Sequence, residues 1–522
     1  MRKFNIAGPC FPDEHYMLPA LERLPGIMRI VEQRGYFVLH SARQSGKTTA
    51  MKALVRELNA AGRMNALYFT VETAQRFADP KDGIPIIVES MRNAVLRHPL
   101  FRNLVRDPSS EIPALRPPPP GLDVKALLVQ LSECSAKPLA VFFDEVDCLS
   151  DDTLVTFLRQ LRDGYITRDE APFPASVALV GMRDIRDYKA RVRPDGQTLG
   201  SASPFNIIKR DLTLGNFREG DIARLYSQHT EETGQVFEPE AVALAWRLTR
   251  GQPWLVNAIA EECVENIHDF RYAEPITAED VETAKETIIR ARGTHVDSLM
   301  ERLKESRVRR VVEPVILGKD AYLSLFDDDY RYALDLGLLR ENEYHVLVPG
   351  NPMYGEIMLR YLSDTEQKRF YNDYRTPFWL RPDGSLDMPA LMAEFQRFWR
   401  ENSGADHEVY GYNEATPHLV MMGYLQRVVN GGGRITREMA LGSKRLDLCV
   451  EFRKFRYAVE LKLRRNFSPA ESYAQLAGYL DTLGLPEGWM AVFDDDASKS
   501  WDEKLYNRDV VFDGKTIHVV GL

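Results

Sequence analysis

Cysteine is scarce in this sequence, and its spacing gives no sign of a cysteine-based site. The chain has 522 residues and five cysteines: Cys10, Cys134, Cys148, Cys263 and Cys449. None forms a C-x-x-C pair, and none lies near histidines at the spacing of zinc ligands. Neither a structural zinc site nor a disulfide framework is indicated, and we expect reduced thiols, as in a cytoplasmic protein.

Long apolar runs and an excess of positive charge are also missing. No segment approaches the roughly 20 apolar residues that a membrane-spanning helix needs, and residues 1–18 lack the apolar core of a signal peptide. The net charge of −9 argues against a general nucleic-acid coating protein, although it leaves room for a local basic patch. We therefore expect a soluble, cytoplasmic protein that does not enter a membrane.

The chain does have the length and composition of a multidomain protein. Hydrophobic residues make up 44% and charged residues 27% of a sequence whose length suggests three or four domains. Four short apolar runs alternate with helical stretches in the first 215 residues: 35–40, 66–71, 139–143 and 177–181. This rhythm predicts a parallel sheet covered by helices on both faces, with the proline-rich segment near 110–122 as a stiff surface insertion.

Residues 40–50, HSARQSGKTTA, lie between the first apolar run and a helical stretch, which is where a phosphate-binding loop is found. Lys47 would reach the outer phosphates, Thr48 would bind Mg²⁺, and Gly46 would let the backbone approach closely. Ser41 stands where such a loop usually begins with glycine, so we expect a differently built first turn. The alternative is a helix start that merely contains GKT. The predicted nucleotide-contacting residues are Ser41, Ala42, Arg43, Gln44, Ser45, Gly46, Lys47, Thr48 and Thr49.

Two acids follow the third apolar run, in LAVFFDEVD. Asp144 could hold the magnesium through water, and Glu145 could activate the attacking water. Taken alone, the pair could equally be a solvated strand end. Together with the loop, it predicts ATP binding and hydrolysis, with Thr48 and Asp144 on the metal and Glu145 as a catalytic residue.

Over residues 1–290 these motifs resemble those of bacterial AAA-like ATPases of the STAND/origin-recognition type. GYFVLHSARQSGKTT and the FFDE strand carry the match. The resemblance implies that Arg183 senses the γ-phosphate, that Pro253 in GQPWLVN packs near the nucleotide in a lid, and that FNIAGPC at 4–10 lines the adenine pocket. From the residues alone, Arg183 could equally form a surface ion pair, and Pro253 could simply separate two helices.

The predicted fold is α/β and multidomain. A P-loop NTPase core with a parallel sheet is expected over 1–215, and a helical lid over 216–300. A winged-helix-like segment with a hairpin-like end follows over 301–363, then a polar linker with some helix over 364–410. The last block, 411–522, is expected to be a separate α/β domain.

Two predicted strands in that block carry charged residues on one face. Because alternate residues of a strand share a face, Glu460 and Lys462 in YAVELKL point the same way. Asp447, between two leucines in RLDLCVEF, faces away from those leucines. Two carboxylates can bind Mg²⁺, and a lysine beside them can assist a water that attacks a phosphodiester.

This arrangement resembles the PD-(D/E)XK nuclease superfamily over 411–522, which would make the domain restriction-endonuclease-like. The resemblance implies metal ligands at Asp447 and Glu460 and a catalytic role for both and for Lys462, although salt-bridged strand pairs can mimic so short a motif. Gln475 and Tyr479 match a Q-x-x-x-Y motif of one branch, or form an ordinary helix face. The remaining implied position is Glu414, as an extra helical metal ligand; the alternative there is a helix-start charge.

The local charge agrees with a nucleic-acid partner. Residues 434–465 contain ten Lys or Arg and four acids, a balance of +6, in a chain that is −9 overall. We therefore expect an ATP- and Mg²⁺-dependent AAA-like switch coupled to a metal-dependent DNA nuclease, and a homo-oligomer is compatible with this class. The alternative is a regulatory ATPase that binds DNA or protein and carries a catalytically silent nuclease-like domain.

Overall fold

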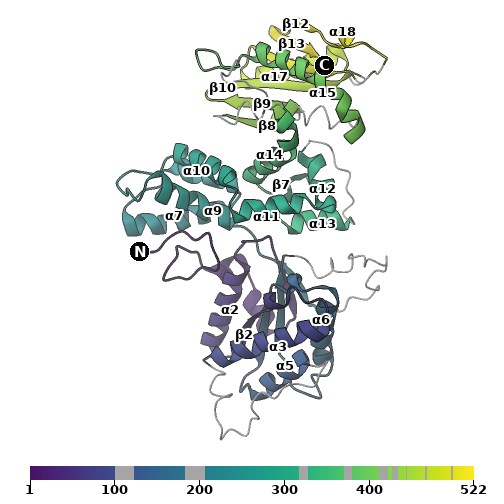
Figure 1. The fold of residues 1–522 in the computed structure, drawn as a ribbon. Coiled ribbons are helices and arrows are strands. Elements are labelled where there is room, and N and C mark those ends of the chain that lie inside the picture. The colour runs from purple at the N-terminus through teal and green to yellow at the C-terminus, as the bar shows by residue number, and fades with distance from the viewer. Residues whose placement is uncertain are drawn as a thin grey trace. The chain divides into compact units, whose positions relative to one another are not determined.

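The computed structural model describes most of the chain, in two compact units (Figure 1). The described residues are 1–99, 123–182, 206–316, 327–369, 379–410, 421–425, 433–441, 444–464, 467–494, 496 and 498–522. The first unit comprises Met1–Arg302 and Leu323–Tyr354, and the second comprises Leu303–Tyr322 and Gly355–Leu522. The predicted proline-rich insertion, Arg183 and Glu414 lie outside the described residues.

A five-stranded parallel sheet organises the first unit. Its strands are β1 (Phe37–His40), β2 (Asn65–Thr70), β3 (Leu139–Asp144), β4 (Ser176–Gly181) and β5 (Arg210–Thr213). Their order is β2-β3-β4-β1-β5, and all the neighbouring pairs are parallel. The four predicted apolar runs form the first four strands. The fifth strand, β5, was not predicted, because its polar and mostly exposed residues give no apolar signal.

Helices cover both faces of this sheet, as the sequence predicted. The helices on one face are α1 (Ile27–Glu32) and α2 (Lys47–Ala61); those on the other are α3 (Pro80–Arg97), α5 (Asp123–Cys134) and α6 (Asp151–Ile166). Neighbouring residues of one strand enter different cores, since Phe142 packs with the first group and Phe143 with the second. Three short helices, η1 (Ala20–Arg23), η2 (Glu72–Ala74) and η3 (Val146–Cys148), complete this region.

Helices follow the sheet in the first unit. They are α7 (Glu219–Thr233), α8 (Pro239–Thr249), α9 (Pro253–Glu261), η5 (Glu262–Ile267) and α10 (Ala278–Ala291). The turn between α8 and α9 needs its glycine, because Gly251 has φ +74° and a Cβ there would lie 2.0 Å from the Phe217 carbonyl oxygen. Pro253 then occupies the first turn of α9, where its missing N–H is no loss.

The region predicted as winged-helix-like contains helices and one small hairpin. Its elements are α11 (Thr294–Leu303), α12 (Ser306–Ile316), α13 (Asp328–Asp335), β6 (Leu339–Glu341), β7 (Leu347–Pro349) and α14 (Pro352–Arg369). The two strands pair antiparallel. Because α12 belongs to the second unit and the hairpin to the first, the winged-helix-like segment stays a prediction.

A six-stranded mixed sheet organises the second unit. Its strands are β8 (Gly433–Leu441), β9 (Lys444–Phe452), β10 (Phe455–Leu463), β11 (Glu487–Phe493), β12 (Asn507–Phe512) and β13 (Lys515–Gly521). Their order is β12-β13-β11-β10-β9-β8, in which β8, β9 and β10 form an antiparallel meander and β10 pairs parallel with β11. The predicted strands at 445–452, 457–463 and 489–494 correspond to β9, β10 and β11.

Helices α17 (Pro469–Leu483) and α15 (Met388–Tyr410) pack on this sheet, and α18 (Trp501–Lys504) is a single short turn. Leu476 and Tyr479 of α17 pack with Met490 of β11 in one core. The Trp399 ring of α15 meets the Phe493 ring with centroids 5.2 Å apart. Residues within the range predicted as a linker therefore belong to the compact body of the second unit.

No helix among the described ranges combines the length and the apolar content that crossing a bilayer requires.

Candidate functional sites

The loop between β1 and α2 begins with a pinned serine. The Ser41 hydroxyl donates a hydrogen bond of 2.9 Å to the carbonyl oxygen of Leu214, just beyond β5. Ser41 is not among the residues with positive φ, whereas Gln44 has φ +56° and Gly46 has φ +94°. The left-handed backbone of this loop thus lies in its second half, and the first position has no need of glycine.

Arg23 links the loop to the segment after β5 by hydrogen bonds. The Arg23 guanidinium donates to the carbonyl oxygens of Ser45 at 2.8 Å and Gly215 at 3.0 Å, and it lies over the Phe217 ring. Burial lowers the pKa of Arg23 to about 10. A Cβ on Gly46 would lie 2.7 Å from this guanidinium, so glycine is required there both for its φ and for this close approach. Sequence reasoning missed Arg23, which lies 22 residues before Ser45 in no recognisable motif.

Lys47 is buried and points back along the loop. Its ammonium donates to the carbonyl oxygens of Ser41 at 2.8 Å and Ala42 at 2.9 Å, and its exposed fraction is 6%. Burial lowers the pKa of Lys47, against the opposing effect of Glu145 and other nearby acids. Its bonding partners are neutral carbonyl groups, so its charge remains available to an anionic ligand.

Asp144, at the end of β3, collects three hydrogen bonds. The Thr48 hydroxyl donates to Oδ2 at 2.6 Å, the Tyr68 hydroxyl donates to the same oxygen at 2.7 Å, and the Glu145 backbone N–H donates to Oδ1 at 3.0 Å. Asp144 is 1% exposed. Burial, reinforced by Asp144, raises the pKa of Tyr68, so its phenol stays a donor. The sequence did not single out Tyr68.

Glu145 has a strained backbone and a raised pKa. Its φ is +61°, in the left-handed region that few residues with side chains adopt. Burial, together with the charges of Asp144 and Asp147, raises the pKa of Glu145 to about 7. A carboxyl group with this pKa can exchange a proton near neutral pH.

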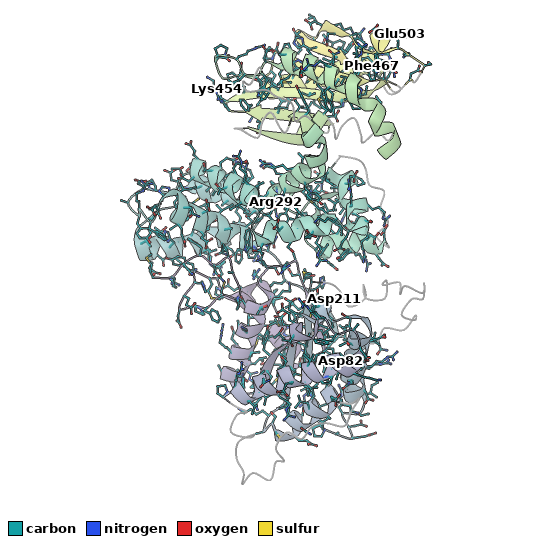
Figure 2. All side chains as sticks on the ribbon, in the orientation of Figure 1. Asp82, Asp211, Arg292, Lys454, Phe467 and Glu503 are labelled. Carbon is teal, nitrogen blue, oxygen red and sulfur yellow. The ribbon has the colours of Figure 1, made fainter. Side chains whose placement is uncertain are left out.

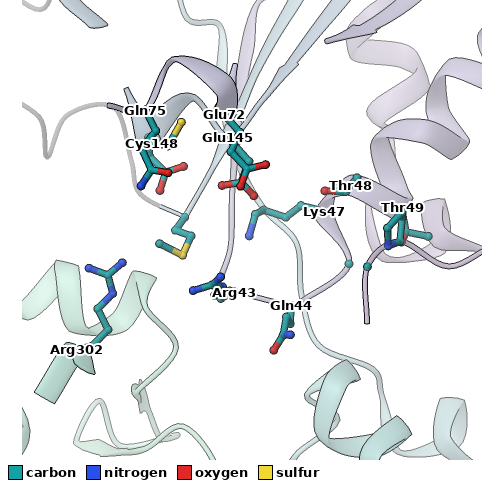
Figure 3. A pocket seen from close by; sticks show the side chains of 15 residues that line it. Arg43, Gln44, Lys47, Thr48, Thr49, Glu72, Gln75, Glu145, Cys148 and Arg302 are labelled. Carbon is teal, nitrogen blue, oxygen red and sulfur yellow. The ribbon is translucent and has the colours of Figure 1, made fainter. Parts of the chain in front are cut away.

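Lys47, Thr48 and Glu145 line a cavity of about 540 Å³ (Figure 3), whereas Ser41 and Asp144 do not line it. Of the residues predicted from the sequence, its lining includes Arg43, Gln44, Gly46, Lys47, Thr48, Thr49 and Glu145. Figure 3 shows the Lys47 and Glu145 side chains reaching into the same space, with Glu72 beside Glu145. Gly8 and Pro9 of the FNIAGPC segment also line it, whereas Pro253 does not. The volume is that of a small-molecule site.

Two side chains of α11 form hydrogen bonds with the loop. The sequence did not predict these contacts. The Arg43 guanidinium donates to the Ser298 hydroxyl at 3.0 Å, and His295 Nδ1 bonds to the Gln44 amide oxygen. Since that oxygen can only accept, Nδ1 carries the proton, and Nε2 accepts from the Tyr354 hydroxyl at 2.7 Å. Burial lowers the pKa of His295 to about 3, so it is neutral.

Gly337, in the turn between α13 and β6, also approaches the loop closely. It has φ +71°, and a Cβ there would lie 2.7 Å from the Ala42 Cβ. Three successive loop residues, 42 to 44, are therefore each contacted by an element that follows α10 in the sequence.

In the second unit, the predicted trio lies together on β9 and β10. Asp447 Oδ2 accepts from the Leu461 N–H at 2.8 Å, and Glu460 Oε2 accepts from the Asp447 N–H at 3.3 Å. The Lys462 ammonium donates to Glu460 Oε1 at 2.8 Å and to the Gln475 amide oxygen at 3.3 Å. Gln475 in turn donates to the Tyr479 hydroxyl at 2.8 Å.

The charged groups of this second cluster shift one another's pKa values. Burial and the neighbouring Asp447 raise the pKa of Glu460 to about 7, and Glu460 is 1% exposed. Burial opposes the ammonium form of Lys462, but Glu460 and Asp447 outweigh it and raise the pKa of Lys462. Within the described part of the chain, no group of three or more His, Cys, Asp or Glu side chains could hold a metal ion. The two carboxylates offer hard oxygen ligands of the kind that Mg²⁺ accepts.

The strand order and the loop after β1 together make the first unit a P-loop NTPase fold. No family model and no curated protein matches the sequence. The Walker-type ATPase PABY2304 of Pyrococcus abyssi matches 68% of this chain and 99% of its own at 13% identity, with a TM-score of 0.48.

Two further solved structures give weaker matches at 13% identity. The RuvB Holliday junction branch migration motor of Thermotoga maritima covers 66% of this chain and 98% of its own, with a TM-score of 0.34. Cdc6p from Pyrobaculum aerophilum covers 66% and 93%, with a TM-score of 0.35. Identities and scores this low carry no argument, so the fold assignment rests on the chain's own topology and loop.

Proposed function

We propose that the first unit binds ATP with Mg²⁺ and hydrolyses it. The observation that carries this proposal is the convergence of Lys47 and Thr48 from the loop with Asp144 and Glu145 from the end of β3. A hydroxyl and a carboxylate 2.6 Å apart fit a magnesium site, in which Thr48 would bind the ion and Asp144 would hold one of its waters.

The remaining roles follow from position and charge. Lys47 would stabilise charge on the outer phosphates, and the backbone N–H groups at the start of α2 would face them. Glu145, whose pKa lies near 7, would accept a proton from the attacking water. When bound, Mg²⁺ supplies charge neutralisation at the phosphates.

Lys47→Ala tests this function. Equilibrium binding of ATP and release of phosphate are measured with the full chain, and we expect both to fall by about a hundredfold or more. Arg56→Ala, an exposed basic position on the same helix, is the matched control and should leave both unchanged. ATP binding that survives Lys47→Ala undiminished would contradict the proposal.

We also propose that nucleotide state acts as a switch through α11. Gln44 and Arg43 belong to the loop that would surround the phosphates, and their side chains bond to His295 and Ser298. A rearrangement of the loop on nucleotide binding would therefore act on its contacts with α11, which lies outside the NTPase core. This is the physical basis for linking the ATP site to the rest of the chain.

For the second unit we propose a metal-dependent DNA nuclease site at Asp447, Glu460 and Lys462, supported by Gln475 and Tyr479. The support is geometric, because two carboxylates and a lysine meet on adjacent strands. Asp447 and Glu460 would hold the metal, and Lys462 would orient a water or stabilise the phosphate. As its pKa is raised, Lys462 acts through its positive charge rather than as a base.

DNA is expected at the second unit rather than at the hairpin of the first. Arg453 and Lys454 are exposed at the turn between β9 and β10, where Figure 2 labels Lys454. In contrast, α13 before the hairpin begins with Asp328 and Asp329 and ends at Asp335, and such charges would repel phosphates.

Lys462→Ala tests the nuclease proposal. Cleavage of plasmid and single-stranded DNA is followed with Mg²⁺ or Mn²⁺, with and without ATP, and we expect a loss of about a hundredfold. Arg400→Ala, which removes an exposed basic side chain of α15 in the same unit, should change the cleavage rate little. ATP hydrolysis without DNA cleavage under any condition would favour the second candidate, a regulatory ATPase with a silent nuclease-like domain. The Lys462–Glu460 ion pair, which already neutralises one carboxylate, is the observation on its side.

A further inference from the structure

Among the described residues, two side chains donate to Asp144, and the proposed reaction gives a role to Thr48 but none to Tyr68. It lies on β2, in register with Phe142 of β3, and its hydroxyl donates to Asp144 Oδ2. The hydroxyl of Thr48 donates to the same oxygen. A single carboxylate oxygen of Asp144 thus receives two hydroxyl donors.

The count of acceptor positions on Asp144 is informative. An ionised carboxylate offers about four lone-pair positions, two on each oxygen. Thr48 and Tyr68 take both positions on Oδ2, and the Glu145 N–H takes one on Oδ1. Asp144 is 1% exposed, so bulk water has little access to it. In the contacts of the described residues, one position on Oδ1 remains for a further donor.

Tyr68 is held in place independently of its hydroxyl. Pairing between β2 and β3 fixes its backbone, and the Lys52 ammonium lies 5.6 Å from the centre of its ring. Lys52 is on α2, the helix that also carries Thr48. Both hydroxyl groups that reach Asp144 Oδ2 are therefore fixed on elements that pack against each other, and replacing the tyrosine with phenylalanine would remove one donor while keeping the ring.

A carboxylate with one acceptor position left is suited to hold a cation through water. Mg²⁺ retains several of its waters and demands a near-octahedral arrangement, whereas Ca²⁺ accepts direct carboxylate ligands in flexible numbers. Occupying Oδ2 with a phenol blocks direct coordination by that oxygen. The same hydrogen bond fixes the direction of the remaining Oδ1 position.

We propose that Tyr68 is a positioning residue that sets the cation preference of this site, since its hydroxyl keeps Asp144 in a water-mediated role that favours Mg²⁺ over Ca²⁺. This inference rests on the proposed ATP site. It adds a specificity determinant that no sequence motif on this chain indicates.

The test measures binding rather than turnover. Binding of a fluorescent ATP analogue to the full chain is titrated with Mg²⁺ and with Ca²⁺, and is repeated in EDTA. For Tyr68→Phe we expect the ratio of half-saturating Mg²⁺ to half-saturating Ca²⁺ to rise about fivefold, the equivalent of one ordinary hydrogen bond. Affinity in EDTA should not change, because Tyr68 does not line the cavity.

Tyr36→Phe is the matched control. The Tyr36 hydroxyl is buried in the same unit and donates to the Pro174 carbonyl oxygen at 2.6 Å, so its removal costs a buried phenol hydrogen bond away from Asp144. Its cation ratio should equal that of the wild type. Lys52→Ala, which loosens the Tyr68 ring without removing the hydroxyl, should shift the ratio in the same direction by a smaller factor.

The outcomes separate this inference from the function beneath it. Binding that depends on Lys47 and on the cation, with an unchanged ratio in Tyr68→Phe, overturns the inference alone. ATP-analogue binding that is the same in the wild type and in Lys47→Ala, and that needs no divalent cation, overturns the proposed ATP site as well. A shift in Tyr36→Phe as large as that in Tyr68→Phe would show a general effect of lost packing and would also overturn the inference.

Discussion

The two candidate sites contain similar groups in opposite states. Each has a lysine near acidic side chains, buried in the case of Lys47 and half-buried in the case of Lys462. The Lys47 ammonium bonds to neutral carbonyl groups, while the Lys462 ammonium bonds to Glu460. Burial lowers the pKa of Lys47, whereas at Lys462 the effect of burial is outweighed by Glu460 and Asp447, which raise the pKa. At the first site the Lys47 ammonium bonds to carbonyl oxygens rather than to a carboxylate, so its charge can act on an anionic ligand although Glu145 and other acids lie nearby. The second is neutralised internally, so a metal there must displace or rearrange the lysine.

The glutamates of the two sites also differ in their surroundings. Glu145 and Glu460 both have pKa values raised to about 7, in each case chiefly by burial and then by a neighbouring aspartate. Glu145 faces a cavity, where its proton can move to and from water. Glu460 is tied to Lys462 and to a backbone N–H. Under the functions proposed above, the same shift would serve proton transfer at Glu145 and would make a proton compete with a metal at Glu460.

The largest expected effect separates catalysis from binding at the first site. Glu145→Gln should lower ATP hydrolysis by about a hundredfold or more, because the amide cannot accept the proton of water. ATP affinity should change by less than about threefold, since Lys47 and the loop are intact. Phosphate release and equilibrium binding measure the two, with Glu57→Gln, at an exposed position of α2, as the control. Equal losses in both would mean that Glu145 is structural.

A smaller effect tests the raised pKa of Glu145 through the pH dependence of ATP hydrolysis. Because the ionised carboxylate is the active form and its pKa is about 7, ATP hydrolysis should rise by about tenfold between pH 6 and pH 8 and level off above that. Asp147→Asn removes one cause of the raised pKa of Glu145, so the profile should move to lower pH. The pH profile of DNA cleavage should not move, and a parallel shift of both profiles would contradict this assignment.

The smallest expected effect concerns α11. His295→Ala removes the partner of Gln44, whose left-handed backbone is unfavourable by itself. We expect ATP affinity to fall by about three- to tenfold, with hydrolysis at saturating ATP nearly unchanged. His345→Ala, at an exposed hairpin position, is the control. Affinity that matches the wild type would show that α11 does not support the loop.

The sequence predicted those parts that produce a local pattern. Four strands of the first sheet and three of the second are visible as apolar runs, and the loop and the D…ExK residues follow from residue type and spacing. Strand β5 has no apolar signal, since its side chains are mostly exposed. Arg23, Tyr68 and His295 act on the loop or on Asp144 across 22, 76 and 251 residues of sequence, respectively. Such contacts exist only after folding, and single-sequence periodicity cannot report them.

Gly337 shows that substitutions far from the GKT sequence can affect the first site. Its backbone is left-handed, and any side chain at this position would press on the Ala42 methyl group. A variant screen for defects in nucleotide handling would therefore recover substitutions almost 300 residues beyond the GKT sequence, in a turn that contains no nucleotide motif. Tolerance to mutation at residue 337 thus depends on the shape of the phosphate loop as much as on its own turn.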